Sequence, residues 1–594
     1  MQNTRKWFSL LLCLILTLTS VSFAIADELI DGEYTGTGTG MHSDIQVKVT
    51  VADGKIANVE VLAQDETPGI SDPAFAQMPQ RIIDAQSADV DVVTTATYTS
   101  NGIIAAVKAA LAGTPEEVEE EEFQPDFIII GGGMAGMSGA IRATELGLKV
   151  LLLEGSARIG GSLLYAGGTL SGAGFKIQKE NGVEDTAEAF YEDIIAIGGI
   201  ENLNAPLAKA HAEKSAAAVD WMDEDIGADF GSRSLFGGWY AQFETLRVTL
   251  SLDDPNLGGG KGFLDPMLAR IDAAVEDGSL KILLNTTATE LVVEDGRCVG
   301  VKVGDKEYSA PTYLLATGGY SHNLELLQMA GFEDAVSAGP STSNGSGYFM
   351  ALAIGGVLDN MDNTYSYHGG GMKTNGFDMQ YRVNTAYPKL VYVDKNGDRV
   401  GNESTGSLNL WKSAEGSTLY AIVCADTKDS DSMFIRVATS AYTPLANNGW
   451  DQLDVLAQEE AGVYKADTLE ELAEKLGTPD LAATIAKYNE DAQQGEDTLF
   501  GRSAETMTAL ENGPFYAVVT VPYAYTASTG GVRANADGQL ALADGSAVEN
   551  LYLAGEIMGP TNISGSVTFG GLDHALCVIW GKNAAEAAAA AIAK

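Results

Sequence analysis

Cysteine, histidine and positive charge are scarce in this 594-residue chain. Its 4 cysteines and 5 histidines are scattered, and no Cys-x-x-Cys-His motif occurs. The scattered cysteines and histidines indicate neither a disulfide framework nor a zinc site, and the missing motif excludes conventional c-type haem attachment. A formal net charge of -45 also makes nucleic acid a poor partner, because phosphate binding requires clustered lysine and arginine.

Long hydrophobic runs are rare, and the exception lies at the N-terminus. Arg5 and Lys6 precede an apolar run over residues 7–18, and small residues follow at 24–26. This order is typical of a signal peptide over residues 1–26, so we predict cleavage before Asp27 and an exported protein, extracellular, cell-surface or periplasmic. A retained membrane anchor is the alternative, although the run is short for a spanning helix. Beyond it we expect no membrane-spanning segment.

The first part of the exported chain has the pattern of a small α+β domain followed by a linker. Within residues 27–114, apolar and polar residues alternate on both sides of Asp53-Gly54, which predicts a β-hairpin. Residues 115–125 are acidic, contain proline and have no apolar face. We therefore predict an extended linker there.

Glycine is abundant, and its arrangement after residue 126 predicts a nucleotide site. An apolar strand at 127–130 leads into Gly131, Gly133 and Gly136, then a helix of small residues and a second strand that ends at Glu154. This is the βαβ unit of a dinucleotide-binding fold, in which the glycines admit a pyrophosphate and the acidic residue accepts hydrogen bonds from a ribose. A nicotinamide enzyme would share this motif.

Three further motifs follow in order: Gly160-Gly161-Ser162 with Ala166-Gly167-Gly168, then Ala316-Thr317-Gly318-Gly319, then Ala554-Gly555-Glu556. Their order resembles the fumarate reductase and succinate dehydrogenase flavoproteins, and a nicotinamide enzyme does not explain them. The resemblance implies noncovalent FAD, contacted by Gly131, Gly133, Ala135, Gly136, Glu154, Gly161, Ser162, Gly167, Gly168, Thr317, Gly318 and Glu556.

The expected fold class is therefore α/β. A Rossmann-like FAD-binding domain would occupy residues 126–360 and 526–594. Mixed strands and short amphipathic helices at 468–476 and 480–488 predict an inserted, mobile α+β capping domain over residues 361–525. The small N-terminal domain would precede both.

A second flavin is expected in the N-terminal domain. Residues 91–97 resemble the acceptor motif of domains that receive FMN from a flavin transferase, which implies a covalent phosphoester on Thr97. Residues 66–69 also fit that family, whereas Thr95 stands where the family usually has glycine. The alternative for residues 94–100 is a polar β-strand.

The resemblance also implies reduction of an activated C=C bond, with hydride from FAD and a proton from an arginine of the capping domain. The segment around Asn396-Gly397-Asp398-Arg399 resembles the one that carries this arginine, so Arg399 is the expected acid. Asp378 and Arg382 are the expected members of a proton relay to it.

The substrate pocket departs from the family pattern. Residues 525–531 lack the histidine of fumarate reductases, and Thr568 stands where they have an arginine. Loss of such a charged contact costs about 2 to 5 kcal/mol, which disfavours fumarate. We expect a more neutral, aromatic pocket that contains Tyr367, His368, Thr374, Tyr525, Ser528 and Thr568.

These expectations describe an exported ene-reductase of an enoate or enone that serves anaerobic respiration. Electrons would pass from a membrane-bound donor through FMN to FAD. Two alternatives stay open: a dehydrogenase or oxidase of the ketosteroid dehydrogenase or aspartate oxidase type, and an electron-transfer flavoprotein without chemistry of its own.

Overall fold

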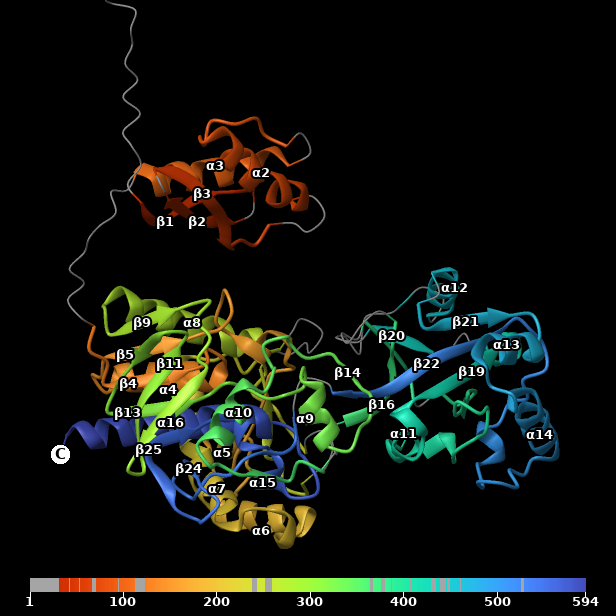
Figure 1. The fold of residues 1–594 in the computed structure, drawn as a ribbon. Coiled ribbons are helices and arrows are strands. Elements are labelled where there is room, and N and C mark those ends of the chain that lie inside the picture. Colours follow the sequence, from red (N-terminus) through yellow and green to blue (C-terminus); the bar gives the residue numbers. More distant parts are fainter. Residues whose placement is uncertain are drawn as a thin grey trace, which may run out of the picture. The chain divides into compact units, whose positions relative to one another are not determined.

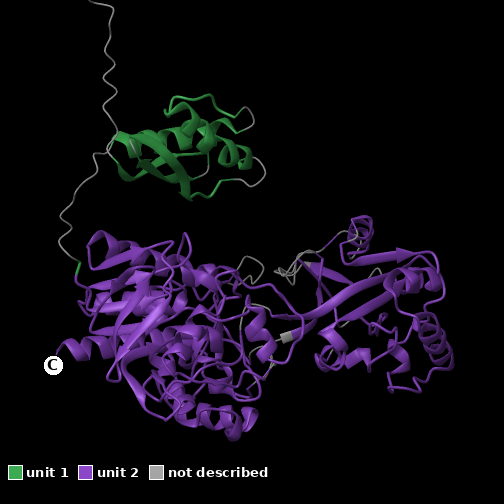
Figure 2. Cartoon of the chain, viewed as in Figure 1, with its two compact units in different colours: residues 1–123 green, residues 124–594 purple. Residues whose placement is uncertain are grey.

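The computed structural model forms two compact units, residues 1–123 and 124–594 (Figure 2). It describes residues 31–593 except 42, 53, 67–70, 94–95, 113–122, 238–242, 252–258, 364–366, 375–379, 386, 406, 429–433, 438–444, 446–448, 460 and 525–527. The predicted signal peptide and most of the predicted linker lie outside the described residues.

The first unit is a three-stranded antiparallel sheet covered by helices. Its elements are β1 Gly32–Thr39, β2 Asp44–Ala52, β3 Lys55–Ala63, α2 Asp72–Ala85 and α3 Thr97–Ala112. Strands β2 and β3 form the predicted hairpin. Apolar side chains at every second position of β2, such as Val47 and Val49, are fully buried with Ile103 and Val107 of α3. A Cβ on Gly36 would lie 2.2 Å from the carbonyl oxygen of Ala106, so glycine lets α3 lie directly on β1.

The second unit contains a nucleotide-binding sheet with strand order β24-β25-β13-β4-β5-β9 (Figure 1). The strands are β24 Gln539–Ala541, β25 Ala547–Leu553, β13 Thr312–Leu315, β4 Phe127–Ile130, β5 Val150–Leu153 and β9 Leu280–Leu283. All but the β24–β25 pair are parallel. The predicted βαβ unit is observed as β4, α4 Met134–Glu145 and β5. Because every side chain of β4 and β5 is buried, these strands form the centre of the sheet.

Several helices surround this sheet. They are α6 Ala187–Gly198, α7 Ala205–Trp221, α8 Lys261–Glu276, α10 Ser346–Ala353 and α16 Leu572–Ile592. Helix α16 packs against α4, where a Cβ on Gly581 would lie 2.5 Å from the carbonyl oxygen of Ala135. Among the described residues, α16 is the helix long and apolar enough to cross a membrane, contrary to the expectation from sequence. Half of its most apolar stretch is buried, which fits a core helix.

The insertion forms a second sheet with strand order β18-β19-β22-β16-β17-β20, and β14 and β21 also pair with β22. Its strands are β14 Val336–Ser337, β16 Tyr367–Met372, β17 Tyr381–Val383, β18 Val391–Val393, β19 Leu419–Cys424, β20 Ile435–Val437, β21 Val463–Ala466 and β22 Phe515–Ala524. Its helices are α11 Asn409–Ser413, α12 Trp450–Gln458, α13 Leu469–Leu476 and α14 Leu481–Gln494. Helix α14 extends six residues beyond its predicted end, to Gly495 in the left-handed conformation. Long β22 links this capping region to β14 of the FAD-binding region (Figure 1).

Candidate active site

A cavity of about 800 Å³ lies in the second unit at the carboxyl ends of β4, β5 and β13. Ligands of open α/β sheets bind at this edge. Ten residues predicted to contact FAD line it: Gly131, Gly133, Ala135, Glu154, Gly161, Ser162, Gly167, Thr317, Gly318 and Glu556.

Gly136 and Gly168, also predicted to contact FAD, are not among the lining residues. A Cβ on Gly136 would lie 1.9 Å from the carbonyl oxygen of Gly131, and one on Gly168 would lie 2.3 Å from that of Gly259. These two glycines are needed for close backbone packing behind the wall of the cavity, and their expected contact with FAD stays a prediction.

The lining residues fit a dinucleotide. Gly131 has φ 106°, and a Cβ there would lie 2.3 Å from the carbonyl oxygen of Ala316. A Cβ on Gly133 would meet no atom within 4 Å, so open space remains directly before the N-terminus of α4. This terminus favours the charge of a pyrophosphate. The hydroxyl of Thr317 is buried at the cavity without a hydrogen-bond partner among the described residues, as a cofactor contact requires.

Glu154 is positioned by the backbone at the end of β5. Its Oε2 accepts a hydrogen bond of 2.7 Å from the amide of Gly132, and its Oε1 accepts one of 2.8 Å from Ser156. Each carboxylate oxygen keeps a lone pair that a ribose hydroxyl can use.

Two buried carboxyl groups, those of Glu556 and Asp573, also line the cavity. Burial raises the pKa of Glu556 to about 8 and that of Asp573 to about 6. The amide of Ser528 donates a short hydrogen bond to Glu556, and the hydroxyl of Ser528 accepts one of 2.7 Å from the amide of Tyr320. Ser528 is buried, does not line the cavity and orients Glu556. Its role as a substrate ligand stays a prediction.

Three lining residues at the start of α16 were missed by sequence reasoning: Asp573, His574 and Cys577. Burial lowers the pKa of His574 to about 4, and its Nδ1 lies 2.6 Å from the carbonyl oxygen of Thr169. Neutral His574 therefore carries its proton on Nδ1 and presents Nε2 as an acceptor. The Gly570-Gly571 pair just before them is the sequence signal that could have indicated them.

The capping region contributes His368 of β16 and Arg382 of β17 to the same cavity. Nη1 of Arg382 donates a hydrogen bond of 2.6 Å to the hydroxyl of Tyr523, whose ring lies 5.4 Å from that of His368. Burial, together with the charge of Arg382, lowers the pKa of His368 to about 4. His368 is therefore neutral at pH 7, and Arg382 is the cation that the capping region places at the cavity.

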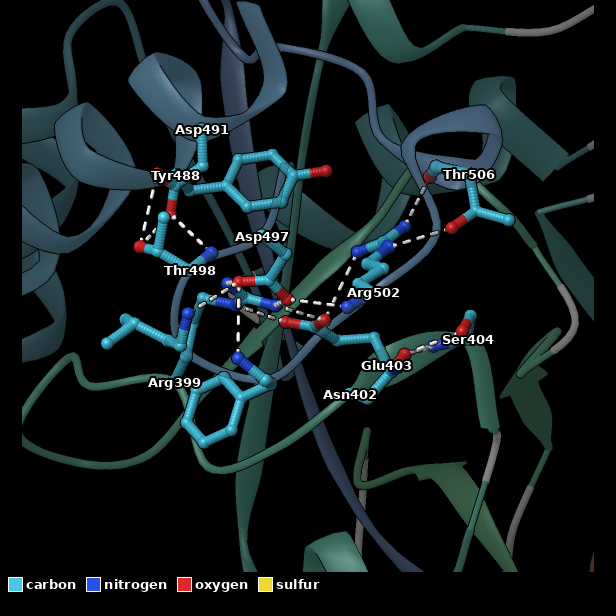
Figure 3. Close-up of polar contacts among 12 residues, drawn as sticks. Arg399, Asn402, Glu403, Ser404, Tyr488, Asp491, Asp497, Thr498, Arg502 and Thr506 are labelled. Atoms are coloured by element: carbon cyan, nitrogen blue, oxygen red, sulfur yellow. Dashed lines mark hydrogen bonds and ion pairs between the residues drawn. The ribbon is translucent and has the colours of Figure 1, made fainter. Parts of the chain in front are cut away.

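Arg399, the expected catalytic acid, lies close to Glu403, Asp497 and Arg502 in the capping region (Figure 3). Its guanidinium makes two hydrogen bonds of 2.7 Å to Glu403 and two of 3.0 Å to Asp497, and it packs 5.1 Å from the rings of Tyr488 and Phe500. Its side chain is 1% exposed and does not line the cavity. The structure does not bring Arg399 to the cavity, because two carboxylates hold it inside the capping region. Its role as the catalytic acid stays an untested prediction.

These contacts belong to a buried ion cluster of Arg399, Glu403, Asp497 and Arg502, which we call the buried quartet. Arg502 donates 3.2 Å to Glu403 and also binds backbone oxygens of Pro388, Leu390 and Thr506. Burial opposes ionisation of Asp497, but Arg399 and backbone amides lower its pKa to about 2. Two cations and two anions balance, which is how proteins tolerate charges in a core.

The remaining predicted substrate residues are placed as follows. Thr568 lines the cavity. Thr374 does not, and its hydroxyl is buried at the turn that packs on Gly462, so its role as a substrate residue stays a prediction. Asp378 and Tyr525 lie outside the described residues, as does the side chain of Tyr367.

In the first unit, Thr97 is the exposed first residue of α3. The helical conformation of residues 97–100 overturns the alternative of a polar strand there. Thr99 in the same turn donates 2.6 Å to buried Glu66, which ties this helix start to the loop after β3. A helix N-terminus favours a phosphate, so the local structure fits an attached FMN. Thr95 lies outside the described residues.

A dinucleotide cavity between a Rossmann-like sheet and an inserted capping sheet defines a two-domain flavoprotein oxidoreductase. The chain belongs to the FAD binding domain family, whose model matches residues 126–568, and an FMN-binding domain model matches residues 40–112. These matches confirm the predicted family resemblance and both flavins.

Similar proteins and a similar solved structure support this family assignment. The chain is 26% identical to NADH:acrylate oxidoreductase of Vibrio harveyi, over 89% of this chain and 58% of that protein. It is 25% identical to urocanate reductase of Eggerthella lenta, over 89% of this chain and 87% of that protein. The open conformation of a flavocytochrome c3 fumarate reductase matches with a TM-score of 0.57 and 25% identity, covering 82% of this chain and 81% of that one, which confirms the fold class.

Proposed function

We propose that this protein reduces an activated C=C bond at the cavity between the FAD-binding and capping regions. The observation that carries the proposal is that FAD-site residues and a cation of the capping sheet, Arg382, line one and the same cavity. Relatives named for acrylate, urocanate and fumarate support it. FAD held by the lining residues would supply the hydride for one carbon of the double bond.

Arg382 takes the role of proton donor that the sequence suggested for Arg399. Its guanidinium reaches the cavity, and the hydroxyl of Tyr523 accepts its hydrogen bond and can return a proton after transfer. Burial raises the pKa of Tyr523, so this hydroxyl keeps its proton at neutral pH. His368 is neutral at pH 7 and is a poor acid there.

The FMN domain serves as the entry point for electrons in this proposal. A flavin transferase would attach FMN to exposed Thr97, and a membrane-bound donor outside the cytoplasm would reduce it. The charges before the N-terminal apolar run support export. A covalent flavin keeps a high effective concentration where a lost cofactor cannot be replaced.

Anaerobic reoxidation of the dithionite-reduced, flavin-loaded protein tests the reaction. The panel is fumarate, urocanate, acrylate, cinnamate and an uncharged aryl enone, with flavin absorbance as the readout and the saturated product identified by mass. We expect rapid reoxidation by at least one nonfumarate compound. Reoxidation by oxygen alone, with peroxide formed, would favour an oxidase.

The variant Thr97→Val tests the attachment. We expect loss of the flavin fluorescence that wild type retains after denaturing electrophoresis, with FAD content unchanged. The control Thr99→Val removes the hydroxyl that donates to Glu66 and should keep covalent flavin in the folded fraction. Covalent flavin in Thr97→Val would show that another residue carries it.

A further inference from the structure

The first turn of α16 brings an acidic side chain to the FAD cavity. Asp573 and Cys577 are four residues apart, so they lie on one face of the helix, and both line the cavity. A Cβ on Gly555 would lie 3.0 Å from the Cβ of Ala135 and 3.2 Å from the Sγ of Cys577, so Cys577 lies at the start of α4. Asp573 is one helical turn away from that point, a rise of about 6 Å along α16.

The order of the strands indicates which half of FAD reaches Asp573. In the nucleotide-binding sheet, β4 lies between β5 on one side and β13 and β25 on the other. Glu154 is available to a ribose at the end of β5, and the start of α4, after β4, favours the pyrophosphate. The other half of the dinucleotide then continues toward Glu556, which follows β25, and toward the first turn of α16. Asp573 therefore lies where the cavity receives the flavin half of FAD.

The carboxyl group of Asp573 has an acceptor that the protein leaves unused. Its Oδ1 is buried and makes no hydrogen bond to any residue that the structure describes. The neighbouring carboxyl of Glu556 differs, because its Oε1 accepts a hydrogen bond from the amide of Ser528. Burial raises the pKa of Asp573 to about 6 and that of Glu556 to about 8, so at pH 7 Asp573 is mostly ionised and Glu556 mostly keeps its proton. A buried carboxylate without a donor is costly, and the flavin half of FAD offers ribityl hydroxyls and a ring N–H.

We propose that Asp573 is a cofactor-binding residue whose carboxylate accepts a hydrogen bond from the flavin half of FAD and whose charge makes the bound flavin harder to reduce. Two-electron reduction adds negative charge to the flavin, and a fixed anion beside it disfavours that change. Asp573 belongs to none of the sequence motifs that indicated FAD. The inference concerns the cofactor alone and goes beyond the proposed function, because it holds whichever substrate the protein reduces.

Two variants separate the charge from the hydrogen bond. Asp573→Asn removes the charge and keeps an acceptor oxygen, whereas Asp573→Ala removes both. Each is made in the full chain with Thr97→Val, so that FAD titrates alone, and Asp272→Asn, an exposed carboxylate of α8 outside the cavity, is the control. In Asp573→Asn we expect reduced FAD to bind about tenfold tighter relative to oxidised FAD, which raises the midpoint potential by about 30 mV for a two-electron couple. The Kd of oxidised FAD, from fluorescence quenching, should be about fivefold higher in Asp573→Ala than in Asp573→Asn, because these two differ in the acceptor and not in charge.

A potential in Asp573→Asn that moves no further than in Asp272→Asn would overturn the effect of the charge. Equal Kd values in the two Asp573 variants would overturn the hydrogen bond. If Asp573→Asn does not fold, the potential of Asp573→Ala decides, since it lacks the same charge, and Asp573→Glu should keep the potential of the parent protein. Both measurements are made without substrate, so their failure would leave the proposed reaction untouched, and a failed reaction would leave them readable.

Discussion

Two groups of arginines in the capping region differ in what surrounds them. In the buried quartet, Arg399 and Arg502 are each about 1% exposed and bound to carboxylates. On the cavity face, Arg382 donates to a tyrosine hydroxyl, and Arg436 keeps a buried Nε without a partner among the described residues. The first group therefore stabilises the core of the capping region, where anions balance it, whereas Arg382 of the second group lines the cavity.

The largest effect on stability is expected from Arg399→Ala, which separates the two groups most clearly. Removing this arginine leaves Glu403 and Asp497 buried with half of their positive partners, which should lower the free energy of unfolding by about 3 to 5 kcal/mol. Denaturant unfolding followed by fluorescence of the capping-region tryptophans measures it. The exposed pair Arg297 and Glu549 supplies the control, since Arg297→Ala should cost less than about 1 kcal/mol.

The activity of Arg399→Ala, measured per folded molecule, tests separately whether Arg399 takes part in catalysis. Arg399→Ala that still folds at low temperature should keep kcat within about threefold of wild type, since Arg399 does not reach the cavity. A stable variant with no activity would restore Arg399 as a catalytic residue.

The second-largest effect on the free energy of unfolding is expected when low pH protonates Asp497 of the buried quartet. The folded-state pKa of Asp497 is about 2, below its ordinary value of 3.8. A depressed carboxyl pKa contributes stability that is complete above 3.8 and is lost as the pH falls through about 2, here about 2 kcal/mol. Asp497→Asn should therefore show a flatter loss of stability between pH 4 and 2, measured by urea midpoints. An unchanged slope would contradict the ion pair.

A smaller pH dependence of the free energy of unfolding is expected from His368 at the cavity. The pKa of His368 falls from 6.5 to about 4 on folding, so the unfolded chain takes up a proton between these values and the folded chain does not. Stability should decline by about 1 to 2 kcal/mol as the pH falls from 6.5 to 4, allowing for the partial exposure of this residue. His368→Gln should remove that decline. His211 and His574, whose pKa values are also lowered by burial, stay in both proteins.

Local patterns predicted the nucleotide site well, and distant partners explain the errors. The glycines after β4 and Glu154 after β5 are defined by spacing within one βαβ unit, which sequence displays directly. Arg399 follows an Asn-Gly turn in a suggestive context, but its role depends on Asp497, 98 residues further along the chain. No residue type or spacing shows that pairing.

The position of Arg436 also could not be predicted from sequence. It belongs to no motif and lies beside Arg382 because β17 and β20 pair in antiparallel register. Ser528 is near a family motif, yet its contacts with Glu556 and Tyr320 form when segments remote in sequence meet. Strand pairing across an inserted domain was the information that the sequence did not display.

The most direct test of the account is the single-turnover reoxidation of dithionite-reduced Arg382→Gln by the best substrate of wild type. With FAD content and unfolding midpoint matched to wild type, we expect the rate to fall about 10² to 10⁴-fold, the range for loss of a general acid. A wild-type rate in this variant would contradict the claim that the cavity face of the capping sheet delivers the proton.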